Sequence, residues 1–515
     1  MPMFQSLVAL LLAALLLLVV ARHVKVPYPT LLALAGMGFA TLPFVPEIAI
    51  DPHLALALFI APALFHAAHE TSPRALKKFW VPLVALAVVA VVLSTAAVAT
   101  LGILWAGLPL AAAIALGAIV APPDAAAAGA VLGEVGLPRR GMLVLQGESL
   151  LNDASALLIF GAALAMAQSQ GGAATPLMLA LAAPGGLVLG VAVGWLYLRM
   201  VHWFAGTLGA SLVDFAMTFG LWLVADHLKL SPVLAVVAFG IFVAQVRPME
   251  QPARDRLQTA AVWSAVVLVL NVVAFMVMGL QSRAVLLKLA PAERWPAVGF
   301  GLAVLGVVLV VRIAWVLGFR VIEGMIAAGG KPDWLPTPPP WKAAIIVSWS
   351  GMRGLLTLAT AFALPASFPQ RDLIVLAAFC VVAGTLILQG LTLGPLIRWL
   401  DLEPDDSLAE QVGKARQGLL EAGLAVIEGN SSQAADALRF RYNAAGKVIE
   451  HTDDPQGVSS FDKLNLRMIC GQRDRLFEMR RAGEIAEDVY HRLQEELDWA
   501  EVDARSFSEN VLKAT

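Results

Sequence analysis

Residues 341–364 read WKAAIIVSWSGMRGLLTLATAFAL, an apolar stretch interrupted at its centre. The stretch is long enough to cross a bilayer, yet its middle holds two glycines, two serines and Arg353. Glycine weakens a helix, and a charged side chain in hydrocarbon costs at least about 2.5–3.5 kcal/mol. Such residues are retained mainly where they serve a site. The pattern therefore predicts a membrane-spanning helix that is broken at mid-depth.

A second apolar stretch, residues 108–133, is broken in a similar way. Pro122 and Pro123 remove backbone donors there, so carbonyls near Ala121 are expected to be free beside the carboxylate of Asp124. If spans one to six and eight to thirteen form two halves, each broken stretch is the fifth span of its half. The halves would then run in opposite directions. Broken helices at corresponding positions of inverted repeats indicate the substrate site of a secondary transporter.

Composition divides the chain into a membrane part and a polar tail. The chain is 59% hydrophobic, against about 45–50% in soluble domains. Charged residues number 37 in residues 1–400 and 37 in the 115 residues that follow. We expect an all-helical membrane domain over 1–400, with about thirteen transmembrane helices, and a small helical cytoplasmic domain over 401–515. The predicted spans are 4–21, 27–45, 53–69, 80–103, 108–133, 142–168, 175–200, 209–227, 231–246, 261–280, 293–320, 341–364 and 372–398.

Charge along the chain predicts its orientation and excludes other classes of protein. Alternate loops hold 14 and 5 Lys and Arg, which places the N-terminus outside and the tail in the cytoplasm. A net charge of -2 gives no indication of nucleic-acid binding. Two cysteines, Cys380 and Cys470, are too few for a disulfide framework or a four-thiolate zinc site. The tail has no phosphate-binding loop or metal-ligand cluster, so we expect no enzyme activity and no cofactor.

Once charges in loops and at span ends are set aside, five ionisable residues remain within the predicted spans: Asp124, Glu148, Asp153, Arg312 and Arg353. Asp214 lies nearer a helix end and is a weaker candidate. Asp124 lies 14 residues before Pro138 and Asp153 lies 15 after it, so both lie roughly 20 Å in from that turn. Two acids at one depth on adjacent antiparallel helices can share one monovalent cation. We therefore expect Asp153 and Asp124 to be the metal ligands.

The signs of these charges predict the stoichiometry of exchange. Three carboxylates and two arginines leave one net negative charge, which one monovalent cation or one proton neutralises. If the two are alternatives, exchange is one for one and electroneutral. Glu148 lies about 140° around the helix from Asp153, so it faces a different partner. We predict an ion pair between Glu148 and Arg353, and a structural role for Arg312.

The heptad Gly147-Glu148-Ser149-Leu150-Leu151-Asn152-Asp153 resembles the signature helix of monovalent cation:proton antiporters of the sodium/proton exchanger (NhaP/NHE) type. The resemblance continues in the expected order along most of residues 1–400. It includes 58–65 for the third span, 124–140 for the broken fifth, 231–240 for the ninth, 275–280 for the tenth, 349–354 for the twelfth and 388–393 for the last.

The resemblance implies a function for individual residues. Asp153 corresponds to the essential acid that binds cation and proton in alternation, and Asn152 to the neutral partner typical of electroneutral members. Asp124 matches the acid of the unwound helix, while Glu148 and Arg353 match an ion pair of the family. It further implies a homodimer in the cell (inner) membrane. A core domain would move against a dimerisation domain by alternating access, and the protein would serve pH homeostasis.

The sequence departs from the family pattern beside the expected site. Pro123 precedes Asp124 where the family usually has Thr or another small residue, so a hydroxyl ligand is replaced by the Pro123 carbonyl. Ala125 follows Asp124 instead of Pro, His66 replaces an acid in the third span, and Ser231-Pro232 replaces Ser-Gly. Exchange of Na⁺ or Li⁺ for H⁺ is the main hypothesis. Exchange of K⁺ for H⁺ on the same fold is the alternative, and a membrane sensor or scaffold is a third.

Overall fold

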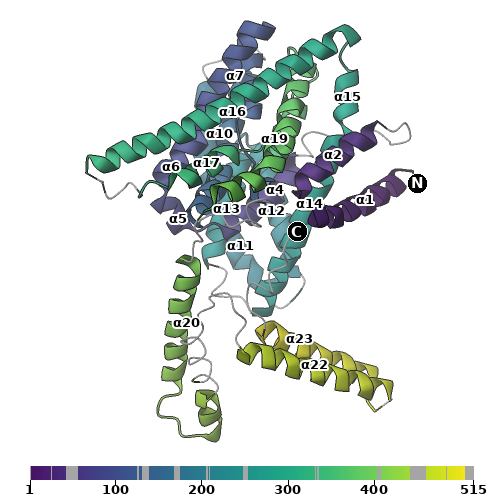
Figure 1. The fold of residues 1–515 in the computed structure, drawn as a ribbon, viewed down its shortest axis with the longest axis vertical. Coiled ribbons are helices and arrows are strands. Elements are labelled where there is room, and N and C mark those ends of the chain that lie inside the picture. The colour runs from purple at the N-terminus through teal and green to yellow at the C-terminus, as the bar shows by residue number, and fades with distance from the viewer. Residues whose placement is uncertain are drawn as a thin grey trace. The chain divides into compact units, whose positions relative to one another are not determined.

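The chain forms two compact units, Met1–Glu403 and Pro404–Ala514, in a computed structural model. All regular structure in the part of the chain that it describes is helical, without a strand (Figure 1). The all-helical class is thereby confirmed. The described residues are 2–24, 26–41, 56–124, 127–129, 139–167, 174–204, 207, 209–246, 253–330, 332, 336–402, 407–440, 443, 460–482 and 484–504.

Six helices of the described residues are long and apolar enough to cross a membrane. They are the helix Trp80–Ala106, which comprises α6 (Trp80–Val84), a π-helical turn η2 (Ala85–Val89) and α7 (Ala90–Ala106), then α10 (Arg139–Ala167), α11 (Ala174–Val201), α14 (Ala253–Leu280), α16 (Pro291–Ala328) and α19 (Arg371–Leu400).

The remaining predicted spans coincide with shorter helices. These are α1 (Pro2–Val24), α2 (Tyr28–Ala40), η1 with α4 (Leu56–Ile60 and Ala61–Glu70), α8 (Leu110–Val120), α12 (Gly209–His227), α13 (Pro232–Val246) and the pair α17 and α18 (Trp341–Trp349 and Leu355–Phe362); short connecting helices are α5 (Pro73–Lys78), η3 (His202–Phe204) and α15 (Ser282–Leu287). Several predicted spans run into residues outside the described part, among them 42–45, 53–55 and 130–133. The count of thirteen and the inverted repeats stay predictions.

Helix α8 packs against α7, α10, α18 and α19, which places its C-terminal end among four neighbours. Its residues are mostly alanine, glycine and branched aliphatics, and nearly all are buried. A Cβ at Gly117 would lie 2.5 Å from the carbonyl oxygen of Thr95 in α7. Only glycine allows this approach, as is usual where membrane helices pack closely.

Helix α10 lies between two clusters of buried apolar side chains. Val144 and Phe160 belong to a cluster built mainly from α7, α8, α16 and α19. Leu150 and Ala154 belong to a second cluster, built mainly from α4, α11, α12 and α13. The segment that carries Asp153 is therefore held from both sides by packing.

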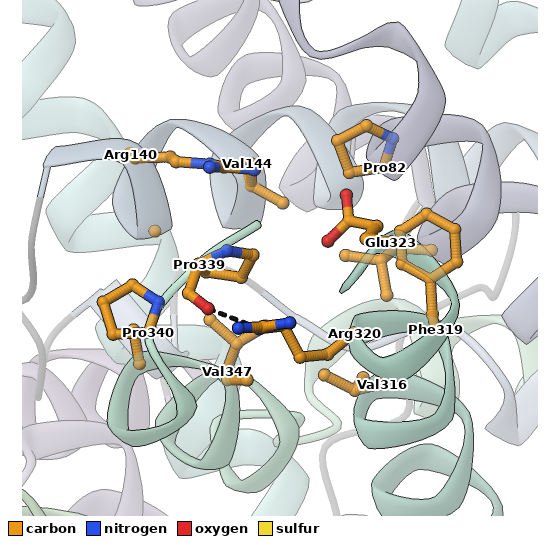
Figure 2. Close-up of a pocket in the computed structure, with 14 residues that line it drawn as sticks. Pro82, Arg140, Val144, Val316, Phe319, Arg320, Glu323, Pro339, Pro340 and Val347 are labelled. Atoms are coloured by element: carbon orange, nitrogen blue, oxygen red, sulfur yellow. Dashed lines mark hydrogen bonds between the residues drawn. The ribbon is translucent and has the colours of Figure 1, made fainter. Parts of the chain in front are cut away.

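A cavity of about 80 Å³ lies between α6, α10, α16 and the start of α17 (Figure 2). Its walls are mostly apolar, and Arg140, Arg320 and Glu323 supply the charged groups. Val347, in the last turn of α17, also lines this cavity.

The described residues of the second unit include the helices α20 (Ser407–Val426), α22 (Ser460–Arg481) and α23 (Glu487–Ala504). Helices α22 and α23 pack together, and Arg473 of α22 forms ion pairs with Asp498 and Glu501 of α23. The cytoplasmic location of this unit stays a prediction.

Candidate functional site

The two predicted breaks are present, and the extended segments that interrupt the helices contact each other. Helix α8 ends at Val120, α17 ends at Trp349, and α18 begins at Leu355. The backbone N–H of Asp124 donates to the carbonyl of Met352 over 2.7 Å. Of the predicted fifth span, residues 125, 126 and 130–133 lie outside the described residues.

Each break supplies a charged side chain to the helix end exposed by the other break. Arg353 is buried, and its guanidinium donates to the carbonyls of Val120 and Ala121 over 3.1 Å each, at the C-terminal end of α8. The carboxylate of Asp124 accepts from the N–H of Leu355 over 3.2 Å, at the N-terminal end of α18. A cation at a helix C-terminus and an anion at an N-terminus both complement the helix dipole.

Two glycines make this crossing sterically possible. A Cβ at Gly354 would lie 1.7 Å from Oδ2 of Asp124, and one at Gly351 would lie 2.2 Å from Cδ of Arg312. Any larger side chain would displace the neighbouring charged group. The glycines that marked the break in the sequence are therefore required by the packing of Asp124 and Arg312.

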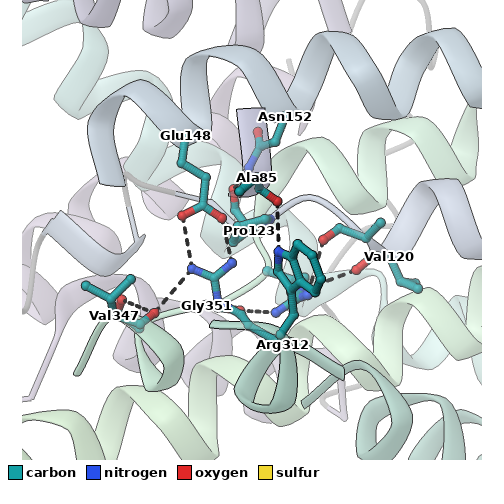
Figure 3. Close-up of polar contacts among 12 residues, drawn as sticks. Ala85, Val120, Pro123, Glu148, Asn152, Arg312, Val347 and Gly351 are labelled. Atoms are coloured by element: carbon teal, nitrogen blue, oxygen red, sulfur yellow. Dashed lines mark hydrogen bonds and ion pairs between the residues drawn. The ribbon is translucent and has the colours of Figure 1, made fainter. Parts of the chain in front are cut away.

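Glu148 pairs with Arg312, so the predicted pair with Arg353 is wrong (Figure 3). Nη1 of Arg312 donates to Oε1 of Glu148 over 2.6 Å, and Nη2 donates to Oε2 over 3.2 Å. Both side chains are buried, and Arg312 also donates to the carbonyl of Val347. The guanidinium of Arg353 is instead directed at carbonyls, among them that of Gly351. Glu148 does form a buried ion pair, as predicted, but its partner is Arg312 and not Arg353.

Asn152 links α10 to the first break. Its buried side chain donates from Nδ2 to the Pro123 carbonyl over 3.1 Å, while its Oδ1 has no hydrogen-bond partner (Figure 3). The Pro123 carbonyl, expected as a cation ligand, thus already accepts one hydrogen bond. A carbonyl oxygen has two lone pairs, so one remains for a cation.

Asp153 differs from the other charged groups at the crossing. Its carboxylate forms no hydrogen bond and no ion pair among the described residues, and its side chain is half-buried. Asp124 is close enough for the two charges to interact, as the depth argument predicted. The structure thus brings Asp153, Asp124, Asn152 and Pro123 together.

Two contributions were missed by sequence reasoning. Thr385 of α19 accepts a hydrogen bond from the N–H of Arg353 over 3.0 Å and so fixes the second break. A threonine in an apolar helix is common, and no signal in the sequence marks this one. The sequence offered two arginines, Arg312 and Arg353, as partners of Glu148, and it contained no feature that selected Arg312.

Asp214, a weaker candidate, lies elsewhere. It is fully buried and accepts hydrogen bonds from the hydroxyl of Tyr197 and, over 3.4 Å, from the indole N–H of Trp263. Its carboxylate is therefore part of another polar cluster, between α11, α12 and α14.

Interrupted membrane helices that meet beside a carboxylate with no hydrogen bond or ion pair among the described residues are the arrangement expected at the substrate site of a secondary transporter. Residues 8–399 match the family of sodium/hydrogen exchanger transmembrane domains, and the chain belongs to that family. It is therefore a multi-pass membrane protein of a transporter family.

The relatives agree with this assignment. The chain is 28% identical over 524 residues to an uncharacterized Na⁺/H⁺ exchanger of Mycobacterium bovis, covering 96% of this chain and 95% of the relative. It is 27% identical over 507 residues to a sodium, potassium, lithium and rubidium/H⁺ antiporter of Bacillus subtilis, covering 93% and 74%. Among solved structures it resembles the sodium proton antiporter MjNhaP1 of Methanocaldococcus jannaschii at pH 8. That match has a TM-score of 0.60 and 18% identity and covers 78% of this chain and 99% of that one.

Proposed function

We propose that this protein exchanges one Na⁺ or Li⁺ for one H⁺ across the membrane by alternating access. One observation carries the proposal: Asp153 is the carboxylate at the crossing that has neither a hydrogen bond nor an ion pair among the described residues. It lies within electrostatic reach of Asp124 and beside Asn152, whose Oδ1 has no partner. These oxygens, with the second lone pair of the Pro123 carbonyl, are suitable ligands for a small monovalent cation.

The other charges at the crossing are matched, which supports a stoichiometry of one for one. Glu148 pairs with Arg312, and Arg353 and Asp124 lie at opposite helix ends of the two breaks. Asp153 is left as the one carboxylate without compensation among these five residues. A single bound cation or a single proton neutralises it, so a full cycle moves no net charge.

The same charge provides the coupling between cation and proton. An ionised, empty Asp153 carries a desolvation cost of several kcal/mol or more when it crosses the low-dielectric barrier. Loaded with a cation or a proton, the site is neutral and can reorient. Exchange is therefore obligatory, because the return step requires the competing ion.

Exchange of K⁺ for H⁺ is the second candidate. It is favoured by the departure at Pro123, which supplies a carbonyl that already accepts from Asn152 in place of a side-chain hydroxyl. A site with fewer strong ligands discriminates less in favour of the smaller, more strongly hydrated Na⁺. The relative in Bacillus subtilis, described as an antiporter of sodium, potassium, lithium and rubidium, supports this breadth.

The proposed architecture has thirteen spans in inverted six-helix repeats, with the N-terminus outside and residues 401–515 in the cytoplasm. We expect a homodimer in the inner membrane that contributes to pH homeostasis, without a cofactor and without enzyme activity. The tail would support the dimer or regulate exchange. Helices α20, α22 and α23 are consistent with either role.

The test is recovery of a pH gradient in liposomes that contain the purified protein, with Na⁺, Li⁺ and K⁺ added separately. We expect Na⁺ and Li⁺ to collapse the gradient, and Asp153→Asn to reduce the rate to that of empty liposomes. A response to K⁺ alone would transfer the ion assignment to the second candidate.

Two further outcomes contradict the proposal itself. Full exchange by a folded Asp153→Asn variant would show that this carboxylate is not the coupling site. No response to any cation at any pH would favour the sensor or scaffold hypothesis, in which the intramembrane charges only hold helices together.

A further inference from the structure

Three charged groups, Arg140, Arg320 and Glu323, line the cavity between α6, α10, α16 and α17, and they form no ion pair with one another among the described residues. Glu323 is only 2% exposed, and its Oε1 has no hydrogen-bond partner. Figure 2 shows its carboxylate directed into the cavity between Pro82 and Arg320. Arg140 and Arg320 interact electrostatically with Glu323 but form no ion pair with it among the described residues.

Both arginines are held in place by contacts that leave their terminal nitrogens available. The guanidinium of Arg140 stacks on the ring of Phe79, 5.4 Å from its centroid. That of Arg320 lies 5.0 Å from the ring centroid of Trp341, and its Nε donates to the Pro339 carbonyl. Neither arginine donates a hydrogen bond from a terminal nitrogen to the described residues.

A buried carboxylate without a partner is expensive, so a ligand that supplies a donor would be stabilising. The cavity volume, about 80 Å³, exceeds the roughly 10–15 Å³ that one buried water needs. Two guanidinium groups suit a phosphate, whereas the carboxylate suits an ammonium. A ligand that carries both charges would satisfy all three groups at once.

The surroundings of the cavity favour a lipid as the source of that ligand. Trp80 and Trp341, at the starts of α6 and α17, are exposed, as is typical of the membrane–water interface. Apolar side chains of α16 on either side of Glu323 are exposed as well: Val321, Ile322, Met325 and Ile326. Charged pockets between membrane helices at this level are known to bind lipid headgroups.

We infer that this cavity binds the phosphoethanolamine headgroup of a membrane lipid. Its phosphodiester would lie between Arg140 and Arg320, and its ammonium would donate to Glu323. The acyl chains would follow the exposed apolar face of α16. Because the lining residues come from α10, α16 and α17, the bound lipid would hold the start of the broken helix against the helix that carries Asp153.

The test measures lipid-dependent thermal stabilisation of the purified full-length protein in detergent. The lipids share the same acyl chains and differ in the headgroup, from ethanolamine through its mono- and dimethylated forms to choline. Each methyl group removes one N–H donor from the ammonium, and choline has none. We expect the concentration for half-maximal stabilisation to rise roughly tenfold from ethanolamine to choline, the value of one hydrogen bond to a charged group.

Three variants assign the effect to this cavity. Glu323→Leu is expected to bring the ethanolamine and choline lipids within about twofold of each other, because the oxygens that accept the ammonium N–H groups are gone. Arg320→Ala is expected to weaken both lipids. Arg199→Ala is the matched control, because Arg199 also stacks on a ring, that of Trp195, but lies outside the cavity.

Several results would overturn the inference. Equal stabilisation of the wild type by the ethanolamine and choline lipids would remove the role of the ammonium, and this comparison needs no variant. An ethanolamine preference that survives Glu323→Leu would place the lipid elsewhere. Equal stabilisation by a phosphatidylglycerol would indicate a site for any phosphodiester lipid, and stabilisation by inorganic phosphate alone would indicate a free-phosphate site.

Discussion

Glu148 and Asp153 lie five residues apart on one helix, yet their surroundings are opposite. Glu148 is buried in a two-bond contact with Arg312, whereas Asp153 has no partner among the described residues and is half-buried. A paired carboxylate is held ionised and fixed, while an unpaired one is free to exchange a proton for a cation. The local environment therefore indicates a structural role for Glu148 and a role in ion binding for Asp153.

The Glu148–Arg312 pair gives a prediction about stability. Arg312→Met is expected to lower the free energy of unfolding by about 3–5 kcal/mol, because Glu148 is then a buried charge without compensation. The double variant Glu148→Leu with Arg312→Met is expected to be more stable than the single variant, since no uncompensated charge remains. Thermal unfolding in detergent measures both.

Arg294→Met serves as the control for that experiment. Arg294 is half-buried and donates to the Leu289 carbonyl without an acidic partner, so its replacement is expected to have a small effect. A double variant that is no more stable than Arg312→Met would contradict the assignment of the pair.

Gly354 gives a prediction about the cation site. A Cβ there would lie 1.7 Å from Oδ2 of Asp124, so Gly354→Ala must displace that carboxylate. We expect the cation concentration for half-maximal exchange to rise roughly tenfold or more, through loss of a hydrogen bond to a charged group. Gly306→Ala is the control, since a Cβ at Gly306 meets nothing within 4 Å. Unchanged cation dependence in Gly354→Ala would exclude Asp124 as a ligand.

At the scale of the helices, the two breaks stabilise each other. The free carbonyls at the end of α8 accept from Arg353, and the free N–H at the start of α18 donates to Asp124. A helix that ends inside a membrane needs such partners because no water is available to replace them. Each break thus supplies hydrogen-bond partners to the other, so each contributes to the stability of the other.

Substitutions of Asp124 separate its capping role from its charge. Asn caps a helix about as well as Asp, whereas Ala costs about 0.5–2 kcal/mol. We therefore expect Asp124→Asn to keep the thermal stability of the wild type and Asp124→Ala to lose it in part. Both are expected to weaken cation binding, measured by cation-dependent exchange in liposomes. If Asp124→Asn kept full exchange, the carboxylate would be a cap alone.

At the scale of the whole molecule, the balance of charge at the crossing determines how exchange responds to voltage. An exchanger that moved one net charge would respond to a 100 mV potential by about 2.3 kcal/mol. Here Asp153 is the one uncompensated carboxylate, so we expect the rate of exchange in liposomes to be the same with and without an imposed potential. Na⁺ as the driving ion keeps the potassium-based potential independent of the substrate. A rate that follows the potential would exclude one-for-one exchange.

The sequence by itself was sufficient for the helical class, the positions of the two breaks and the proximity of Asp124 to Asp153. Each rests on local physics: hydrocarbon excludes charge, proline and glycine interrupt helices, and a helix rises by a constant amount for each residue. Depth in the membrane is therefore encoded along the chain. The resemblance of the heptad 147–153 and other segments to known antiporters then predicted the family, and the match over residues 8–399 confirms it.

The tertiary structure alone decided which charges meet. Helical phase showed that Glu148 faces away from Asp153, but it could not choose between Arg312 and Arg353, both more than 160 residues distant in sequence. Arg312 belongs to α16 and Arg353 follows α17, so the choice depends on where these two helices lie relative to α10, which no short sequence pattern records. The crossed caps, the role of Thr385 and the cavity around Glu323 have the same origin, because each joins helices that are remote in sequence and adjacent only after folding.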